Sequence, residues 1–98
     1  MNRSTAIETL RRNANILRDM GATSLYLFGS TALGEARPES DLDIFIDYDH
    51  ASRFSLMDLV GIKLFLEENV AAHIDITTRD SLHPMLKSDI ERSAIRVF

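Results

Sequence analysis

The sequence has no cysteine among its 98 residues, which excludes disulfide bonds and metal sites with thiolate ligands. It also lacks an apolar run of the roughly 18–20 residues that a membrane-spanning helix needs. Its first fifteen residues contain no apolar stretch of the kind that a signal peptide carries. Together these absences predict a cytoplasmic protein with no membrane span.

Positive charge is scarce as well, since 11 Lys and Arg stand against 15 Asp and Glu for a net charge of −4. A broad nucleic-acid surface is therefore not expected, because affinity for DNA or RNA depends largely on neutralising phosphates. One small phosphate-bearing ligand stays compatible with this balance, since it needs only a local positive site or a metal ion. The length and the 45% hydrophobic content predict a single domain over residues 1–98.

Helical and strand patterns alternate along the chain. Helices are expected from Thr5 to about Gly21, over Ser55–Asn69 and over Pro84–Arg92, and strands over Ser24–Ser30, Asp41–Tyr48 and Ala71–Thr77. The tail 94–98 is a candidate edge strand. This order predicts an α/β (α+β) domain with one small mixed sheet covered by helices, although the connection lengths leave open which strands pair parallel.

Polar residues mark several helix starts. Thr5 and Glu8 have the spacing of a capping box, and Ser55 can cap the long middle helix. Ser30 is the expected N-cap of a short helical turn, "TALGEA". The apolar period of the middle helix is predicted from Leu56, Leu59, Val60 and Leu64.

Two aspartates interrupt the second strand pattern, "DLDIFIDY". Because strand residues i and i+2 face the same way, Asp41 and Asp43 share one face while Leu42, Ile44 and Ile46 supply the core face. Asp75 in "HIDIT" alternates with two isoleucines in the same manner. If both strands turn their apolar faces to one core, the three carboxylates converge, and such a cluster needs a cation or a raised carboxylate pKa. Carboxylates with substrate phosphates are typical Mg²⁺ ligands.

A Gly-Ser pair precedes these aspartates. Gly29 ends a strand and lets the backbone approach a ligand, and Ser30 opens a helical turn whose N–H groups favour an anion. Either feature alone is typical of an ordinary turn. A turn that can bind phosphate, followed by a metal-binding Asp-x-Asp, is a more specific combination than either feature alone.

The stretch "GSTALGEARPESDLDIFI" resembles the G-S-x(10)-D-x-D signature of polymerase-β-like nucleotidyltransferases, and in particular the minimal nucleotidyltransferases of prokaryotes. The similarity extends over nearly the whole chain. It implies that Gly29 and Ser30 hold the β- and γ-phosphates of a nucleotide. It also implies that Asp41 and Asp43 bind two Mg²⁺ ions, while Asp75 shares one ion and helps to deprotonate the attacking hydroxyl.

The resemblance further implies a partner. Small members of this family are paired with a HEPN-domain RNase toxin. The resemblance implies that this chain is the antitoxin of such a pair and adds AMP from ATP to a tyrosine of the toxin. Two alternatives stay open. The acceptor can be a small molecule or an RNA end, or the chain can neutralise its partner by binding alone.

One departure concerns charge. Many relatives have an arginine directly after Gly-Ser, where this chain has Thr31. Positive charge for the triphosphate must then come from elsewhere, and Arg37 and Lys63 are the candidates. His73 would face the carboxylates too, but a polar residue near the start of a strand is the favoured explanation.

Overall fold

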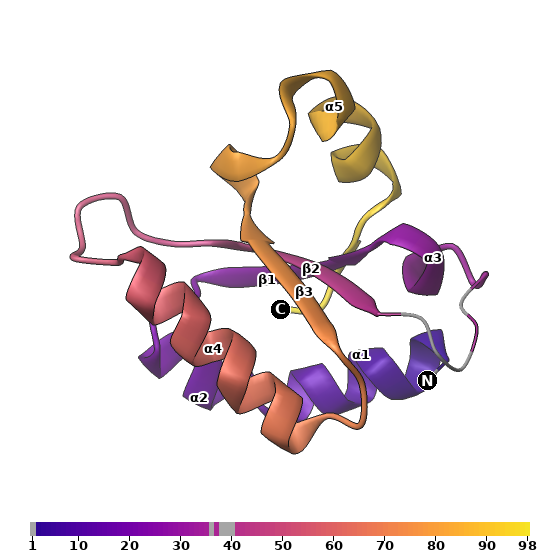
Figure 1. Ribbon diagram of the computed structural model, residues 1–98, viewed down its shortest axis with the longest axis horizontal. Coiled ribbons are helices and arrows are strands. Elements are labelled where there is room, and N and C mark those ends of the chain that lie inside the picture. Colours follow the sequence, from indigo (N-terminus) through magenta and orange to yellow (C-terminus); the bar gives the residue numbers. More distant parts are fainter. Residues whose placement is uncertain (1, 36, 38–40) are drawn as a thin grey trace.

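The computed structural model describes residues 2–35, 37 and 41–98. Within them, strands form one sheet in the order β3-β2-β1-β4 (Figure 1). The strands are β1 (Ser24–Phe28), β2 (Leu42–Asp47), β3 (Ile74–Thr78) and β4 (Ile95–Arg96). The helices are α1 (Arg3–Arg12), α2 (Ala14–Asp19), α3 (Gly29–Ala32), α4 (Leu56–Asn69), the 3-10 turn η1 (Arg79–Ser81) and α5 (Pro84–Ser93).

Both pairing directions occur in the sheet. The central strand β2 runs antiparallel to β1 and parallel to β3, while β4 adds to β1 antiparallel. The predicted small mixed sheet is therefore confirmed, and the tail does form an edge strand. The directions left open by the sequence are decided by the connections: β2 reaches β3 through α4, whereas β1 reaches β2 through α3 and the following segment.

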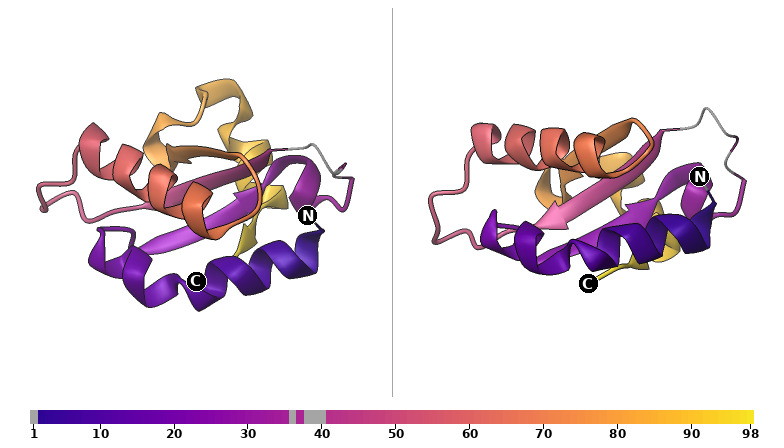
Figure 2. Two further views of the ribbon diagram at one scale, coloured as in Figure 1. Left: turned by 60° about the horizontal axis from the view of Figure 1, so that its bottom comes forward. Right: turned by 90° about the horizontal axis from the view of Figure 1, so that it is seen from below.

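Helices cover one face of the sheet along its length and only part of the other. Seen from below, α1, α2 and α4 lie on the near face and α5 lies behind the strands (Figure 2). The core fills the space between the sheet and α1, α2 and α4, and its fully buried large side chains include Leu10, Leu17, Leu25, Leu27, Leu42, Ile44, Ile46, Ile62 and Leu66. The opposite face of the sheet carries the aspartates and is therefore where the candidate site lies.

The first helix differs from the expectation at both ends. It starts at Arg3, because the Asn2 side chain accepts a hydrogen bond from the Thr5 backbone N–H at 2.8 Å and caps the helix three residues before the predicted cap, Thr5. The predicted capping box at Thr5 and Glu8 is therefore wrong. The continuous helix to Gly21 is wrong as well, since it breaks at Asn13 into α1 and α2.

Ser30 is not the cap of the short helix. The structure starts α3 at Gly29 with Phe28 as N-cap, so Ser30 is the second helical residue. The start moves because Gly29 adopts a positive φ of 73°, which turns the chain directly out of β1.

The predicted bounds of the middle helix are correct, but its predicted buried face is wrong. Ser55 caps α4 in a capping box with Asp58. Ile62 and Leu66 are the fully buried residues, whereas Leu56, Val60 and Leu64 are exposed. No helix in the described ranges is long and apolar enough to cross a membrane.

Candidate active site

The three aspartates lie on one face of the sheet at the start of β2 and β3. Asp43 and Asp75 are direct partners across the parallel pair, and Phe28 of β1 is the partner of Asp43 on its other side. Asp41 precedes β2 and is exposed. The sequence prediction that Asp75 shares a face with Asp43 is confirmed by this register. Asp41 lies outside the register, but its charge acts on Asp43 and it lines the same hollow as Asp75.

Electrostatic repulsion acts within this cluster. The pKa of Asp43 is raised above its ordinary value, first because the group is partly buried and then because Asp75 and Asp41 are negatively charged neighbours. A hydrogen-bonding contact between the Asp43 and Asp75 side chains raises it further. The cluster therefore favours either a proton or a cation at this point.

The backbone of Gly29 lies directly against Asp43. A Cβ placed on Gly29 would overlap the carboxylate oxygen Oδ2 of Asp43, and the positive φ of Gly29 also disfavours a side chain. The Gly-Ser turn and the Asp-x-Asp strand therefore meet, although 13 residues lie between Gly29 and Asp43 in the sequence. This close approach to a carboxylate needs glycine. The predicted approach of the Gly29 backbone to a ligand stays a prediction.

A hollow of about 390 Å³ opens beside the carboxylates. Its lining residues are Asp41, Lys63, Glu67, His73, Ile74 and Asp75. Lys63 of α4, one of the two cations predicted for the triphosphate, thus borders the same space as two of the aspartates. His73 borders it as well, and its imidazole lies 3.7 Å from Glu67. A larger hollow of about 510 Å³ lies along α1 and contains none of the aspartates.

The other residues singled out in the sequence, Ser30, Thr31 and Arg37, do not line the hollow beside the aspartates. Ser30 is half-buried in α3, and its carbonyl accepts from the Glu35 N–H at 2.8 Å. Thr31 is buried, and its hydroxyl has no hydrogen-bond partner among the described residues. Arg37 is exposed and follows the α3 turn. Its role at the triphosphate stays a prediction, and "RPES" otherwise lies outside the described residues.

The donor set suits a hard divalent cation. The cluster offers carboxylate oxygens only, which is what Mg²⁺ takes from proteins, usually together with waters and substrate phosphates. Among the described residues no group of three His, Cys, Asp or Glu is already arranged as a metal site. An ion here would be held by two or three of these aspartates and completed by phosphate oxygens.

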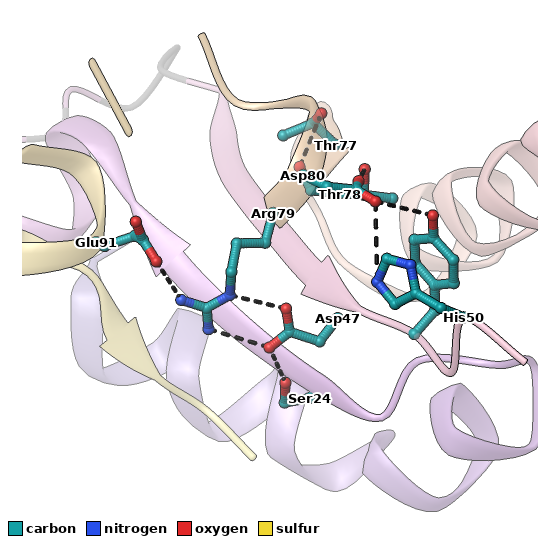
Figure 3. Close-up of polar contacts among 9 residues, drawn as sticks. Ser24, Asp47, His50, Thr77, Thr78, Arg79, Asp80 and Glu91 are labelled. Atoms are coloured by element: carbon teal, nitrogen blue, oxygen red, sulfur yellow. Dashed lines mark hydrogen bonds and ion pairs between the residues drawn. The ribbon is translucent and has the colours of Figure 1, made fainter. Parts of the chain in front are cut away.

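An arginine that the sequence did not reveal occupies the other end of the same face. Arg79 of η1 donates to both Asp47 oxygens at 2.8 and 3.0 Å and to Glu91 of α5 at 2.6 Å (Figure 3). Its guanidinium also lies over the stacked rings of Tyr26 and Phe45, 4.7 and 4.9 Å from their centroids. Because these partners are far apart in sequence, no local motif could have indicated the network.

This network fixes the charges around it. Hydrogen bonds from Arg79 hold the pKa of Asp47 below its ordinary value, and a bond from the Ser24 hydroxyl at 2.6 Å acts in the same direction. Arg79 is consequently engaged by two carboxylates and two rings. Lys63, by contrast, lines the hollow beside Asp41 and Asp75.

A second polar cluster in Figure 3 lies beyond Asp47. The Tyr48 hydroxyl donates to Asp80 at 2.9 Å, and the Tyr48 ring stacks on His50 and Phe54. Bonds from the Thr78 and Tyr48 hydroxyls lower the pKa of Asp80. These contacts tie η1 to the segment between β2 and α4 and contribute no group to the carboxylate cluster.

Comparison with known proteins agrees with this geometry. The model of the nucleotidyltransferase domain family matches residues 10–97. A protein from Methanocaldococcus jannaschii that bears the provisional name protein adenylyltransferase MJ0435 is 37% identical over 90 residues, covering 92% of this chain and 95% of that protein. The chain belongs to the nucleotidyltransferase domain family.

Solved structures support the same fold. One described provisionally as a minimal nucleotidyltransferase superposes with a TM-score of 0.82 at 32% identity, covering 97% of this chain and 95% of that one. A second is a complex of a tri-AMPylated Shewanella oneidensis HEPN toxin with its MNT antitoxin, at a TM-score of 0.63 and 20% identity, covering 91% and 70%. The latter likeness concerns the fold alone.

Proposed function

We propose that this chain is a Mg²⁺-dependent protein adenylyltransferase that transfers AMP from ATP to a tyrosine of a HEPN-domain toxin and thereby acts as its antitoxin. The observation that carries the proposal is the meeting of Gly29, Asp43 and Asp75 at one point of the sheet face opposite α1, α2 and α4. The family membership and the adenylyltransferase name of the relative support the reaction class. The HEPN toxin in the second structural neighbour supports the acceptor class.

Each residue has a defined task in this reaction. Gly29 and Ser30 present backbone N–H groups to the β- and γ-phosphates, and Lys63 and Arg37 supply positive charge to the triphosphate. Asp41, Asp43 and Asp75 hold Mg²⁺, which would neutralise charge on the phosphates and on the departing pyrophosphate. Asp75, on the edge strand β3, accepts the proton of the tyrosine hydroxyl. The tyrosine oxygen then forms a bond to the α-phosphorus, and the bond from the α-phosphorus to pyrophosphate breaks.

The proposal is tested by incubating the chain with α-labelled ATP, Mg²⁺ and the purified toxin. We expect label on a toxin tyrosine with the parent chain and at least about a hundredfold slower labelling with Asp43→Ala, because the variant loses charge stabilisation at the reacting phosphates. Asp89→Asn is the matched control, since Asp89 is an exposed aspartate of α5 outside the cluster. Full-rate labelling by Asp43→Ala would exclude the proposed role of Asp43.

Two other outcomes would identify the open alternatives. Label that transfers without the toxin, to a small molecule or an RNA end, would change the acceptor but keep the chemistry. Neutralisation of the toxin by an Asp41→Ala, Asp43→Ala double variant as effectively as by the parent would show that binding alone is sufficient.

A further inference from the structure

The strand β3, which carries Asp75, is held on its outer side by a side chain of α4. Since β3 lies at an edge of the sheet, alternate N–H groups of β3 face away from β2, where the described residues form no further strand. The N–H of Ile74, the residue before Asp75, donates to the Glu67 oxygen Oε2 at 3.2 Å. On the inner side, the N–H of Leu42 in β2 donates to the His73 carbonyl at 2.9 Å. The start of β3 is therefore fixed from both sides.

Glu67 occupies a position that does not suit an acid for the sake of the helix. It lies in the last turn of α4, where the helix dipole favours a basic side chain, and residues 66–69 include none. The helix and β3 lie side by side and are joined by residues 70–73 (Figure 1). Ile74 is only 3% exposed, and a buried N–H without an acceptor is costly. The bond across this short connection therefore explains the acid.

Asp75 needs this restraint because it repels its neighbour. The pKa of Asp43 is raised by burial and then by the negative charge of Asp75, so the two carboxylates tend to separate. Asp43 belongs to the central strand, which is paired with β1 on one side and β3 on the other. Asp75 has a strand on one side only. Its backbone depends on Glu67 for the second attachment.

We infer that Glu67 is a positioning residue that holds Asp75 beside Asp43 by accepting the N–H of Ile74. The inference rests on the proposed function and adds to it a residue outside the three aspartates and the Gly-Ser turn. It requires an acceptor oxygen at position 67 and not a negative charge, because an amide oxygen accepts an N–H as a carboxylate oxygen does. Glu67 also lines the hollow beside Asp41 and Asp75, where a metal ligand or a proton acceptor would need the charge.

Two substitutions separate the acceptor from the charge. Glu67→Gln keeps an oxygen for the Ile74 N–H and removes the charge, whereas Glu67→Met keeps the length of the side chain and removes both. With α-labelled ATP, Mg²⁺ and the toxin, Glu67→Met should lower kcat about tenfold and leave KM for ATP within about twofold, because a displaced Asp75 impairs the transfer step. Glu67→Gln should keep at least about half of the parent kcat, because the acceptor is restored.

NMR without ATP, metal or toxin measures the contact itself. The Ile74 amide should exchange its hydrogen at least about tenfold faster in Glu67→Met than in the parent or in Glu67→Gln, because it loses its acceptor. The carboxyl carbon signal of Asp75 should shift in Glu67→Met and keep its parent position in Glu67→Gln. Glu68→Met and Glu68→Gln are the matched controls, since Glu68 is exposed in the same last turn of α4. Both should follow the parent in exchange, in the Asp75 signal and in kcat.

The inference and the proposed function fail differently. A Glu67→Gln kcat as low as that of Glu67→Met would overturn the inference, because the charge would then be the property that matters. Parent-like kcat, Ile74 exchange or Asp75 signal in Glu67→Met would overturn it as well. A parent chain that transfers no AMP would contradict the proposed function, and the Ile74 exchange and the Asp75 signal would still decide whether Glu67 positions Asp75.

Discussion

At the scale of single residues, the site depends on how closely backbone and carboxylate approach. Gly29 touches Asp43, and Asp43 touches Asp75, so three residues from three elements share one small volume. Neither aspartate is strongly buried, and Asp75 remains exposed. The pKa of Asp43 is raised by its surroundings, which is typical of a group placed for function rather than for stability.

Gly29→Ala tests this close approach, with Gly34→Ala as its control. Both glycines have nearly the same positive φ, 73° and 75°, but a Cβ on Gly34 meets nothing within 4 Å. We expect Gly34→Ala to lose only about 1 kcal/mol of unfolding free energy, because of its backbone conformation. Gly29→Ala should lose more and should transfer AMP at least about tenfold more slowly, since the methyl group displaces Asp43.

Urea unfolding and the labelling assay measure the two effects. Equal losses of stability and of transfer rate in the two alanine variants would contradict the role given to the Gly29–Asp43 contact. The comparison is informative because backbone strain is common to both variants.

At the scale of elements, Arg79 joins α5 to the sheet. The residues of α5 include none that is fully buried, so apolar packing holds this helix weakly. Arg79 compensates by bridging Asp47 of β2 and Glu91 of α5 while lying over Tyr26 and Phe45. An ion pair with bidentate geometry, a second carboxylate and ring contacts stabilises more than an exposed pair does.

Arg79→Gln should therefore lower the unfolding free energy by about 1–3 kcal/mol at pH 7, because it leaves two partly buried carboxylates without their cation. The pH dependence has a defined sign. Since Arg79 lowers the pKa of Asp47 in the folded chain, the stabilisation is complete above the ordinary aspartate pKa of about 4 and is lost as pH falls through the lowered pKa. The difference between parent and variant should accordingly narrow below about pH 4.

Urea unfolding of parent and variant between pH 7 and pH 3 measures this difference. Arg92→Gln serves as the control, because Arg92 pairs with Asp89 at a distance of 3.5 Å and both side chains are 74% exposed. Such a pair should contribute no more than about 0.5 kcal/mol. An Arg79→Gln effect as small as that of Arg92→Gln would show that packing, not the ion pairs, holds α5.

The elements also show what the sequence could and could not predict. Period-two alternation placed Asp41, Asp43 and Asp75 on one face, because strand geometry alone determines that pattern. Alternation does not specify strand neighbours, so the antiparallel β1–β2 pair required the structure. Leu56, Val60 and Leu64 were predicted as the apolar period of α4 but are exposed, since hydrophobicity alone does not distinguish a buried helix face from an exposed one. The Arg79 network joins residues that no local spacing connects.

At the scale of the whole molecule, the carboxylate cluster of Asp41, Asp43 and Asp75 reduces the stability that the core provides. Asp43 has a raised pKa in the folded chain, so its ionisation at neutral pH is less favourable folded than unfolded. Stability from this group should therefore increase as pH falls through that raised pKa. At neutral pH a bound cation should have the same stabilising effect as a proton, because it neutralises the cluster.

Ligand-linked stability consequently reports on the site without any partner. At a Mg²⁺–ATP concentration about a hundredfold above its Kd, the folded parent should gain about 2.7 kcal/mol, which is a rise of several degrees in Tm for a domain of this size. Asp43→Asn should unfold at a higher temperature than the parent without ligand, since it removes one charge from the cluster. With Mg²⁺–ATP the variant should gain little, so the order of the two proteins reverses. Differential scanning calorimetry at pH 7 measures all four states, and Asp89→Asn should follow the parent in each. An equal gain for Asp43→Asn and the parent would mean that the nucleotide and its metal bind away from the three aspartates.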